Sequence, residues 1–298
     1  MRIAVTGSSG LVGSALVRSL TADGHTVVRL VRRAASRPDE VRWDPRAGTV
    51  DTASLGPVDA AVHLAGAGIG DKRWTAAYKR ELRDSRVLGT TAIARALAAL
   101  DPAPRVLVSG SALGFYGDTG DRAVDETAPP GGGFLAEICT EWEAATAPAL
   151  EAGVRVAHIR TGLVVARGGG AWGRMFPLVK AGLGGRLGSG RQYWSFISLA
   201  DEVAAIRYVL DHDAIAGPVN LTAPHPVTNA EATKAMGRAL HRPTLFAVPP
   251  FALRAVLGEF AGEILTGQRV LPRVLLDAGF TFEHPTIDTA IAAAIAAD

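Results

Sequence analysis

Apolar and polar residues follow two different periods along the first half of the chain. Short β-branched runs predict strands at residues 2–6, 26–32, 59–66, 105–111 and 154–165. Between them, apolar residues at helical spacing predict helices, most clearly over residues 11–22, 74–100 and 134–152. Repeated strand, helix and strand require crossover connections, which give a parallel sheet with helices on both faces. The pattern therefore predicts a doubly wound α/β fold.

Two parts of the chain depart from this pattern. Within the first half, residues 34–58 lack a long helical pattern and predict an irregular connection or a small hairpin. After residue 165 the chain is glycine-rich, and it continues in proline-punctuated helices such as 228–242, which begins with the capping-box pair Thr228 and Glu231. The final AIAAAIAAD predicts a terminal helix. We therefore expect a larger domain of residues 1–165, to which about 195–212 return, and a smaller α+β domain of residues 166–298 over the carboxyl edge of the sheet.

Composition narrows the class of protein. The 298 residues are 48% apolar, which excludes a disordered chain, and no apolar run reaches the roughly 18 residues that a membrane span needs. The net charge of +2 arises from 31 basic and 29 acidic residues that are interspersed, so no basic block predicts binding to nucleic acid or to a membrane. The single cysteine, Cys139, excludes an internal disulfide, and no signal-peptide pattern precedes the first strand. We expect a cytoplasmic protein.

The stretch VTGSSGLVGSAL carries the first candidate chemistry. It places Gly7, Gly10 and Gly13 between a predicted strand and a predicted helix. Glycines at this spacing permit a tight turn, let backbone N–H groups approach a pyrophosphate, and let the helix pack closely on the strand. Because the motif sits in the right structural context, it predicts dinucleotide binding rather than a merely structural turn.

The end of the second predicted strand selects between the two nicotinamide dinucleotides. Sites that prefer NAD carry an acidic residue here to bind the ribose 2′-hydroxyl, whereas a 2′-phosphate calls for arginine. This chain has Arg32 and Arg33 at that point. A guanidinium can bind a phosphate bidentately, so the pair predicts NADP, the alternative being that one arginine is a solvated surface charge.

The glycine pattern, HLAG at the end of the third predicted strand and SGSALGFYG after the fourth together resemble the extended short-chain dehydrogenase/reductase superfamily. Its members include NAD(P)-dependent sugar-nucleotide epimerases and dehydratases. The motifs WDP, KRW, FLAEICTEWEAA, GSGRQYWSFI and VLPRVLLDAGFTF resemble an atypical branch of epimerase family proteins, over nearly the whole chain. The resemblance implies a Rossmann fold and a C-terminal domain without an assigned function, and homodimers are common in the superfamily.

The resemblance also implies a set of cofactor contacts. They are Gly7, Gly10, Leu11 and Val12 at the diphosphate, Arg32 at the 2′-phosphate, Leu64, Ala65 and Gly66 on the adenosine side, and Leu163 near the nicotinamide. Within the branch, Glu81 and Arg86 face the nucleotide. The alternative for these two is a surface pair, although five residues is not an ideal helical pair spacing.

The usual proton-transfer pair of the superfamily, Tyr-x-x-x-Lys, is missing from FLAEICTEWE. One register places Leu135 and Cys139 at its two positions, and a shift by one residue places Phe134 and Ile138 there. No register restores the pair, and the resembling branch lacks it too. An acid–base pair of this kind contributes roughly 100- to 10,000-fold to a rate, and apolar side chains cannot replace it.

Ser111 and Tyr116 are the catalytic candidates that remain. Ser111 matches the superfamily's catalytic Ser/Thr, whose hydroxyl can polarise a substrate carbonyl, while the alternative is a strand-end hydroxyl satisfied locally. Tyr116 is the nearest spare phenol, although in ordinary members this tyrosine lines the pocket without acting as the acid. A lone cysteine such as Cys139 on an amphipathic helix is typically a small buried residue rather than a reactive thiol.

The other polar and aromatic residues define no separate site. In sugar-nucleotide enzymes, segments equivalent to the glycine-rich ones here bind the substrate, and in this chain they carry Arg167, Arg174, Arg191 and Tyr193. Trp194 and Phe196 alternate as core residues do. The remaining candidates are His63 and His158, without metal-ligand spacing, and a polar loop typical of solvated surface with Asp121, Asp125 and Glu126. We predict no metal site.

Two hypotheses about function follow. The first is an NADP(H)-binding oxidoreductase of the epimerase/dehydratase type that acts on an unknown small molecule, for which a nucleotide-sugar is one candidate. The second is a non-catalytic regulator or interaction protein that senses NADPH, which the missing Tyr-Lys pair favours. The sequence leaves the substrate, the stereochemistry and the oligomeric state open.

Overall fold

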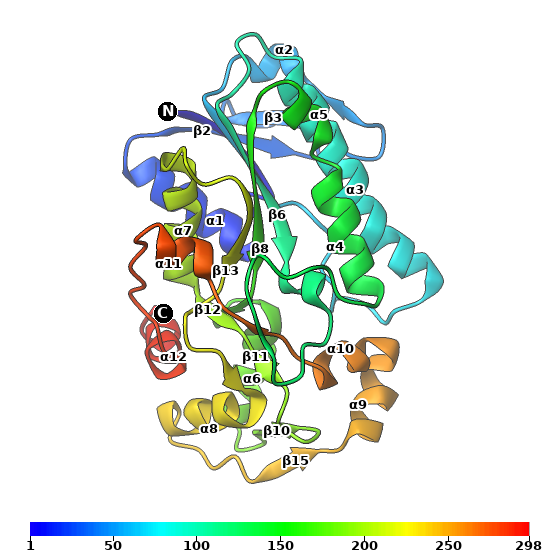
Figure 1. The fold of residues 1–298 in the computed structure, drawn as a ribbon, viewed down its shortest axis with the longest axis vertical. Coiled ribbons are helices and arrows are strands. Elements are labelled where there is room, and N and C mark those ends of the chain that lie inside the picture. The colour runs from blue at the N-terminus through cyan, green and yellow to red at the C-terminus, as the bar shows by residue number, and fades with distance from the viewer. Residues whose placement is uncertain (298) are drawn as a thin grey trace.

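The computed structural model describes residues 1–297, which are built around one eight-stranded sheet (Figure 1). The strand order is β13-β8-β6-β5-β1-β2-β3-β4, and all neighbours are parallel except β3 and β4. The strands are β1 (Arg2–Thr6), β2 (Thr26–Val31), β3 (Glu40–Asp44), β4 (Thr49–Val50), β5 (Ala60–His63), β6 (Val106–Ala112), β8 (Arg155–Thr161) and β13 (Gly217–Leu221). Because β2 and β5 flank β1, the strand order reverses at β1, which is where doubly wound folds bind ligands.

Helices cover both faces of the sheet because successive strand residues are apolar on opposite sides. Ile3 and Val5 of β1 pack in a core with α1 (Leu11–Ala22) and α7 (Leu199–Asp211), whereas Ala4 joins a second core. That second core is completed by α2 (Thr52–Leu55), α3 (Ala76–Ala98) and α5 (Ala147–Glu151), and α4 (Phe134–Ala144) lies beside α3. The predicted doubly wound α/β fold is confirmed.

Most of the rest of the chain forms a smaller region at the carboxyl edge of the sheet, whereas α11 (Arg273–Asp277) packs against β13 in the core of the large sheet (Figure 1). The helices of the smaller region are α6 (Gly170–Lys180), α8 (Asn229–Ala239), α9 (Pro250–Leu257), α10 (Ala261–Leu265) and α12 (Ile287–Ala296), with the 3-10 turns η1 (Leu113–Tyr116) and η2 (Gly258–Phe260). Its short strands are β7 (Ala123–Val124), β9 (Leu163–Val165), β10 (Gly185–Leu187), β11 (Tyr193–Trp194), β12 (Phe196–Ser198), β14 (Val227–Thr228), β15 (Phe246–Val248) and β16 (Arg269–Val270). Trp194 and Phe196 lie in its core, as the sequence predicts.

Two predicted elements are interrupted, each at a residue that explains the break. The strand predicted over 154–165 is divided at Gly162 into β8 and β9, and β9 leaves the large sheet to pair with β12. A Cβ on Gly162 would lie 2.7 Å from the carbonyl oxygen of Ser195, so only glycine fits there. The helix predicted over 134–152 is two helices, because Pro148 has no N–H to continue α4 and instead stands at the start of α5.

Other predictions of local structure are confirmed. Residues 40–50 form the small antiparallel hairpin β3–β4, and α12 is the terminal helix. Thr228 and Glu231 form the predicted capping box of α8. β13 also joins the large sheet, so the chain returns to it beyond residue 212, while the two-domain division stays a prediction. No helix within residues 1–297 is both long and apolar enough to cross a membrane.

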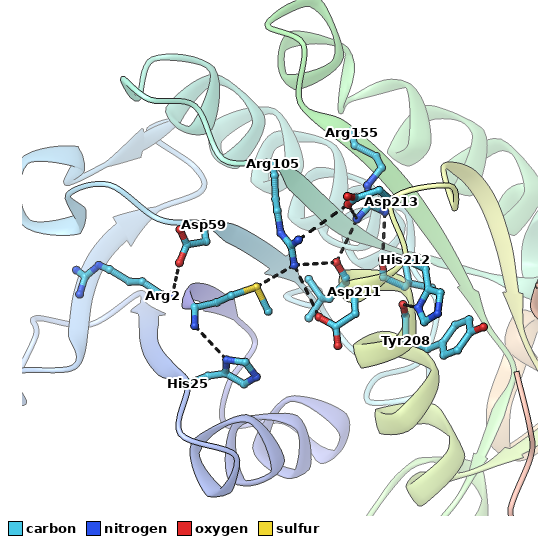
Figure 2. A network of polar contacts seen from close by, with 12 residues as sticks. Arg2, His25, Asp59, Arg105, Arg155, Tyr208, Asp211, His212 and Asp213 are labelled. Atoms are coloured by element: carbon cyan, nitrogen blue, oxygen red, sulfur yellow. Dashed lines mark hydrogen bonds and ion pairs between the residues drawn. The ribbon is translucent and has the colours of Figure 1, made fainter.

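A polar network closes the amino-terminal edge of the sheet, opposite the predicted site (Figure 2). Arg155 donates to the carbonyl oxygens of Val209, Leu210 and Ile215, and Arg105 donates to that of Leu210. The carbonyls of Val209 and Leu210 lie at the C-terminal end of α7, where the helix dipole is negative and cations are stabilising. The network therefore fixes the C-terminal end of α7 to the sheet, at the edge opposite the candidate site.

Candidate functional site

The glycine turn after β1 has the close contacts that its sequence predicts. Gly7 has φ +66, and a Cβ there would lie 2.8 Å from the backbone of Leu64. A Cβ on Gly13 would lie 2.2 Å from the carbonyl oxygen of Gly7. Gly10 is the N-cap of α1, no side chain caps that helix end, and its first turn has no acidic residue. The N–H groups of Leu11 and Val12 are therefore left for an external anion.

The two arginines at the end of β2 have different surroundings. Arg33 forms a bidentate ion pair with Glu40 and also donates to Ser36 Oγ at 2.9 Å. Hydrogen bonds to its carboxylate, first from Arg33 and then from the Ser36 N–H, lower the pKa of Glu40 to about 2. Arg32 is exposed and has no ion pair or hydrogen bond from its side chain among the described residues. Of the two, Arg32 is thus the guanidinium available to a 2′-phosphate.

Thr6 fixes the loop that follows β5. Its Oγ1 accepts hydrogen bonds from the N–H groups of Leu64 and Ala65 at 3.1 and 3.2 Å, and it lies 2.7 Å from His63 Nδ1. Burial lowers the pKa of His63 to about 4, so this ring is neutral. The loop with the predicted adenosine contacts, which include Gly66, is thereby held beside the glycine turn. Thr6 is a residue that the sequence did not single out.

A polar row crosses three strands near the carboxyl edge. Ser111 of β6 and Asn220 of β13 both align with Arg160 of β8, so the three side chains share one face of the sheet. Glu143 of α4 covers that face: Arg160 binds its carboxylate bidentately at 2.8 and 2.9 Å, and Ser111 Oγ donates to it at 2.6 Å. Burial alone would lower the pKa of Arg160, but the hydrogen bonds that it donates to Glu143 and the charge of that carboxylate outweigh burial and raise the pKa of the guanidinium.

Tyr116 belongs to the same network. Its hydroxyl donates to Asn220 Oδ1 at 2.7 Å and accepts from Arg160 Nη1 at 2.9 Å, and the side chain is buried. Burial raises the pKa of the phenol. With its proton already donated inside the protein, Tyr116 has the geometry of a positioning residue. Its role as a surrogate acid stays a prediction.

The network continues to the start of α11 through Glu126. Its carboxylate accepts from the N–H groups of Asn220, Arg273 and Val274 at 2.9, 3.2 and 3.3 Å. The side chain is buried, and burial raises its pKa, so the expectation of a solvated loop is wrong for Glu126. Asp125 pairs with Arg273, whereas Asp121 is exposed. The sequence offered no signal for Arg160 or Asn220, because their partners lie far away along the chain.

The start of α4, where the sequence analysis looks for a Tyr-Lys pair, is apolar. Leu135 packs against Gly114, where an added Cβ would lie 2.9 Å from the Leu135 Cβ. Phe134 and Leu135 join a cluster with Trp74 and with Phe260 of η2. Cys139 is buried, and burial raises the pKa of its thiol to about 12, so the interpretation as an unreactive packing residue is supported.

Arg86 and Glu81 do not form the alternative surface pair. Glu81 binds Lys72 at 3.1 Å, whereas the Arg86 guanidinium donates to the carbonyl oxygen of Leu82 and lies 5.0 Å from the ring centre of Trp142. A Cβ on Gly66 would lie 3.6 Å from the Arg86 Cζ, so the cation lies against the loop after β5. Burial lowers the pKa of Arg86, and the nearby Cys139 acts in the opposite direction.

The other predicted residues do not gather at one place. Leu163 opens β9, and Arg174 donates to Gly70 across the interface with the loop after β5. The guanidinium of Arg269 lies over the ring of Tyr193, 4.9 Å from its centre, and Arg191 is exposed. His158 Nε2 forms a hydrogen bond with Thr146 Oγ1 at 2.9 Å. A cavity of about 890 Å³ lies behind the glycine turn between α1, α7 and α12, and none of the polar row lines it. Residues 1–297 hold no cluster of three metal-ligating side chains.

Comparison with known proteins places this geometry in a family. The model of the NAD dependent epimerase/dehydratase family matches residues 3–221, which contain the glycine turn and the polar row. The chain belongs to this family. A domain of unknown function, DUF1731, matches residues 248–294, from the end of β15 into α12. Both parts of the resemblance found in the sequence are thereby confirmed.

Relatives cover the chain nearly end to end. An epimerase family protein of Mycobacterium bovis is 50% identical over 290 residues, 97% of this chain and 96% of that one. The solved structure of human epimerase family protein SDR39U1 with NADPH has a TM-score of 0.93 at 32% identity and covers all of both chains. A nucleoside-diphosphate sugar epimerase of Corynebacterium glutamicum has a TM-score of 0.79 at 38% identity, over 98% of this chain and 57% of that one.

Proposed function

We propose that this protein binds NADP(H) and transfers hydride between the nicotinamide and a carbonyl or alcohol carbon of a small molecule, with sugars linked to a nucleoside diphosphate as the first class to test. The observation that supports NADP(H) over NAD(H) is the difference between the two arginines at the end of β2. Arg33 is bound by Glu40, whereas Arg32 is exposed and has no partner among the described residues. The NADPH in the human relative's structure supports the same choice.

The residues present fit such a cofactor. Gly7, Gly10, Leu11 and Val12 would surround the diphosphate, Arg32 the 2′-phosphate, and Leu64, Ala65 and Gly66 the adenosine side. When bound, the nicotinamide beside Leu163 supplies or accepts the hydride. We assign to Arg86 the positive charge that ordinary members deliver from their lysine, because its buried guanidinium lies near Cys139, which stands at the lysine position in one of the two registers. Glu81 orients the neighbouring loop through Lys72.

Ser111 handles the proton in this proposal. Its hydroxyl donates to Glu143, so its oxygen can accept the proton of a substrate alcohol while Glu143 accepts the serine proton. In the reverse direction, rotation of the same hydroxyl toward the substrate polarises a carbonyl. Arg160 holds the carboxylate in place through its two bonds.

The second candidate is an NADPH-sensing regulator without chemistry. The observation that favours it is the apolar cluster around Phe134 and Leu135 in place of a proton donor. A titration with NADPH, followed by addition of nucleotide-sugars and small carbonyl compounds, separates the two. NADPH oxidation triggered by one compound supports the enzyme, whereas tight binding with no oxidation across the panel favours the regulator. Absence of binding contradicts both.

A further inference from the structure

Exposed apolar side chains gather in the smaller region. Ten large apolar residues are exposed within residues 1–297, and six of them fall in two short segments: Leu178, Leu183, Leu245, Phe246, Phe251 and Val256. Their exposed fractions run from 51% for Leu178 to 87% for Leu245. Isolated exposed apolar residues are ordinary on a protein surface, but a concentration of this kind marks an interaction site.

The fold brings the two segments together. Gly185 of β10 pairs with Phe246 of β15, the N–H of Leu183 donates to the carbonyl oxygen of Leu178, and Arg242 Nε donates to that of Lys180 at 3.0 Å. Figure 1 shows β10, β15 and α9 at one end of the molecule's long axis, far from α2 at the other end. We call residues 178–186 and 242–256 the basal surface.

The basal surface and the residues that flank it are also basic. Residues 177–191 and 232–258 contain no Asp or Glu, and their cations are Lys180, Arg186, Arg191, Lys234, Arg238, Arg242 and Arg254. In the described part of the chain, only Arg238 of these seven has a carboxylate partner, Asp288. The bordering Glu259 is bound by Lys79. The whole chain has a net charge of only +2, but these two segments have an excess of positive charge. The fold brings that excess to one end of the molecule.

We propose that the basal surface docks on the face of a lipid bilayer that contains anionic lipids. Leucine and phenylalanine side chains that protrude can enter the boundary between headgroups and acyl chains, while lysine and arginine bind the headgroups. Leu183 follows a turn at Gly182 with φ +77, and Leu245 precedes an exposed strand, so both protrude instead of lining a groove. A second copy of the chain is a poorer occupant, because a shared two-fold contact would bring these unpaired cations together.

Sedimentation of the full chain with lipid vesicles tests this proposal. The vesicles are an equal mixture of phosphatidylcholine and phosphatidylserine, compared with phosphatidylcholine alone. One variant combines Leu245→Ser with Phe246→Ser, and a second combines Lys180→Glu with Arg254→Glu. The matched control combines Leu88→Ser with Arg80→Glu, both exposed on α3. All variants change exposed side chains, and their melting temperatures report that the fold is kept.

The wild-type protein should sediment with the mixed vesicles and not with phosphatidylcholine alone, and salt should weaken the binding. Each basal variant should lower the partition coefficient about tenfold or more, and the control should leave it unchanged. The proposal is overturned if the mixed vesicles bind no protein, or if the basal variants bind as the wild type does. Binding to soluble polyglutamate without binding to the mixed vesicles also overturns it, in favour of an acidic protein partner.

Discussion

Arg160 and Glu143 form a bidentate ion pair whose side chains are only 4% and 13% exposed, and Ser111 donates to the same carboxylate. The stretch FLAEICTEWE of α4 contains no Tyr-x-x-x-Lys pattern, and Glu143, one helical turn beyond Cys139, accepts hydrogen bonds from both Arg160 and Ser111. The candidate catalytic centre is therefore organised around a buried charge pair and one serine.

Removal of one partner from this pair should be costly. Glu143→Ala strands a buried guanidinium, and we expect a loss of about 3–5 kcal/mol in the free energy of unfolding, measured by urea denaturation. Asp288→Ala, which breaks the exposed pair with Arg238, should cost less than about 1 kcal/mol. Equal losses in the two variants would show that the central pair contributes little.

Two serines on β6 provide a matched test of the proton-transfer proposal. Ser111 is bonded to Glu143, whereas Ser109, on the same face two residues earlier, is buried with no hydrogen-bond partner for its hydroxyl. For any substrate found, Ser111→Ala should lower kcat by roughly 100-fold or more and leave NADPH affinity unchanged. Ser109→Ala should keep the wild-type rate. A Ser111→Ala enzyme with full turnover would remove serine from the mechanism.

The sequence predicted what depends on local pattern. Gly7 and Gly13 were found because their backbone contacts follow from a turn between a strand and a helix, and the strands around them have a clear period. Arg160 and Asn220 were missed, and Glu126 was assigned to a solvated loop, because their network is made across strands and through Leu271 and Val274, which lie far away along the chain. Arg32 and Arg33 looked equivalent, and only the approach of Glu40 in three dimensions separates them.

Glu202 should impose a pH dependence on stability. It is buried on α7, receives one hydrogen bond from Thr161 at 2.8 Å, and burial raises its pKa from 4.5 to about 8. Between these values the folded chain keeps a proton that the unfolded chain releases, so this group's contribution to the free energy of unfolding falls as pH rises, by up to about 1.4 kcal/mol per unit.

The variant Glu202→Gln keeps the neutral form at every pH. Urea denaturation from about pH 5 to about pH 8 should show the variant gaining stability over the wild type as pH rises. Glu151→Gln, at an exposed position, should give a difference that does not depend on pH. A constant difference for Glu202→Gln would mean that its carboxyl group ionises normally.

The glycine turn should not tolerate even a methyl group. Gly13→Ala places a Cβ 2.2 Å from the Gly7 carbonyl oxygen, which must move the turn, so NADPH affinity should fall at least about tenfold. Gly262→Ala adds a Cβ with nothing within 4 Å, and in a helix it should stabilise the fold by up to about 1 kcal/mol without affecting binding. Isothermal titration of both variants measures this, and an unchanged affinity for Gly13→Ala would place the nucleotide elsewhere.

The most direct test of the account is the affinity of the wild type, Arg32→Glu and Arg46→Glu for NADPH and NADH, followed by nicotinamide fluorescence. Arg46 is an exposed arginine on the β3–β4 hairpin turn and serves as the charge-matched control. We expect the wild type and Arg46→Glu to prefer NADPH, and Arg32→Glu to lose at least about tenfold in NADPH affinity while retaining NADH binding. An Arg32→Glu protein that binds NADPH as tightly as the wild type would contradict the proposed nucleotide site.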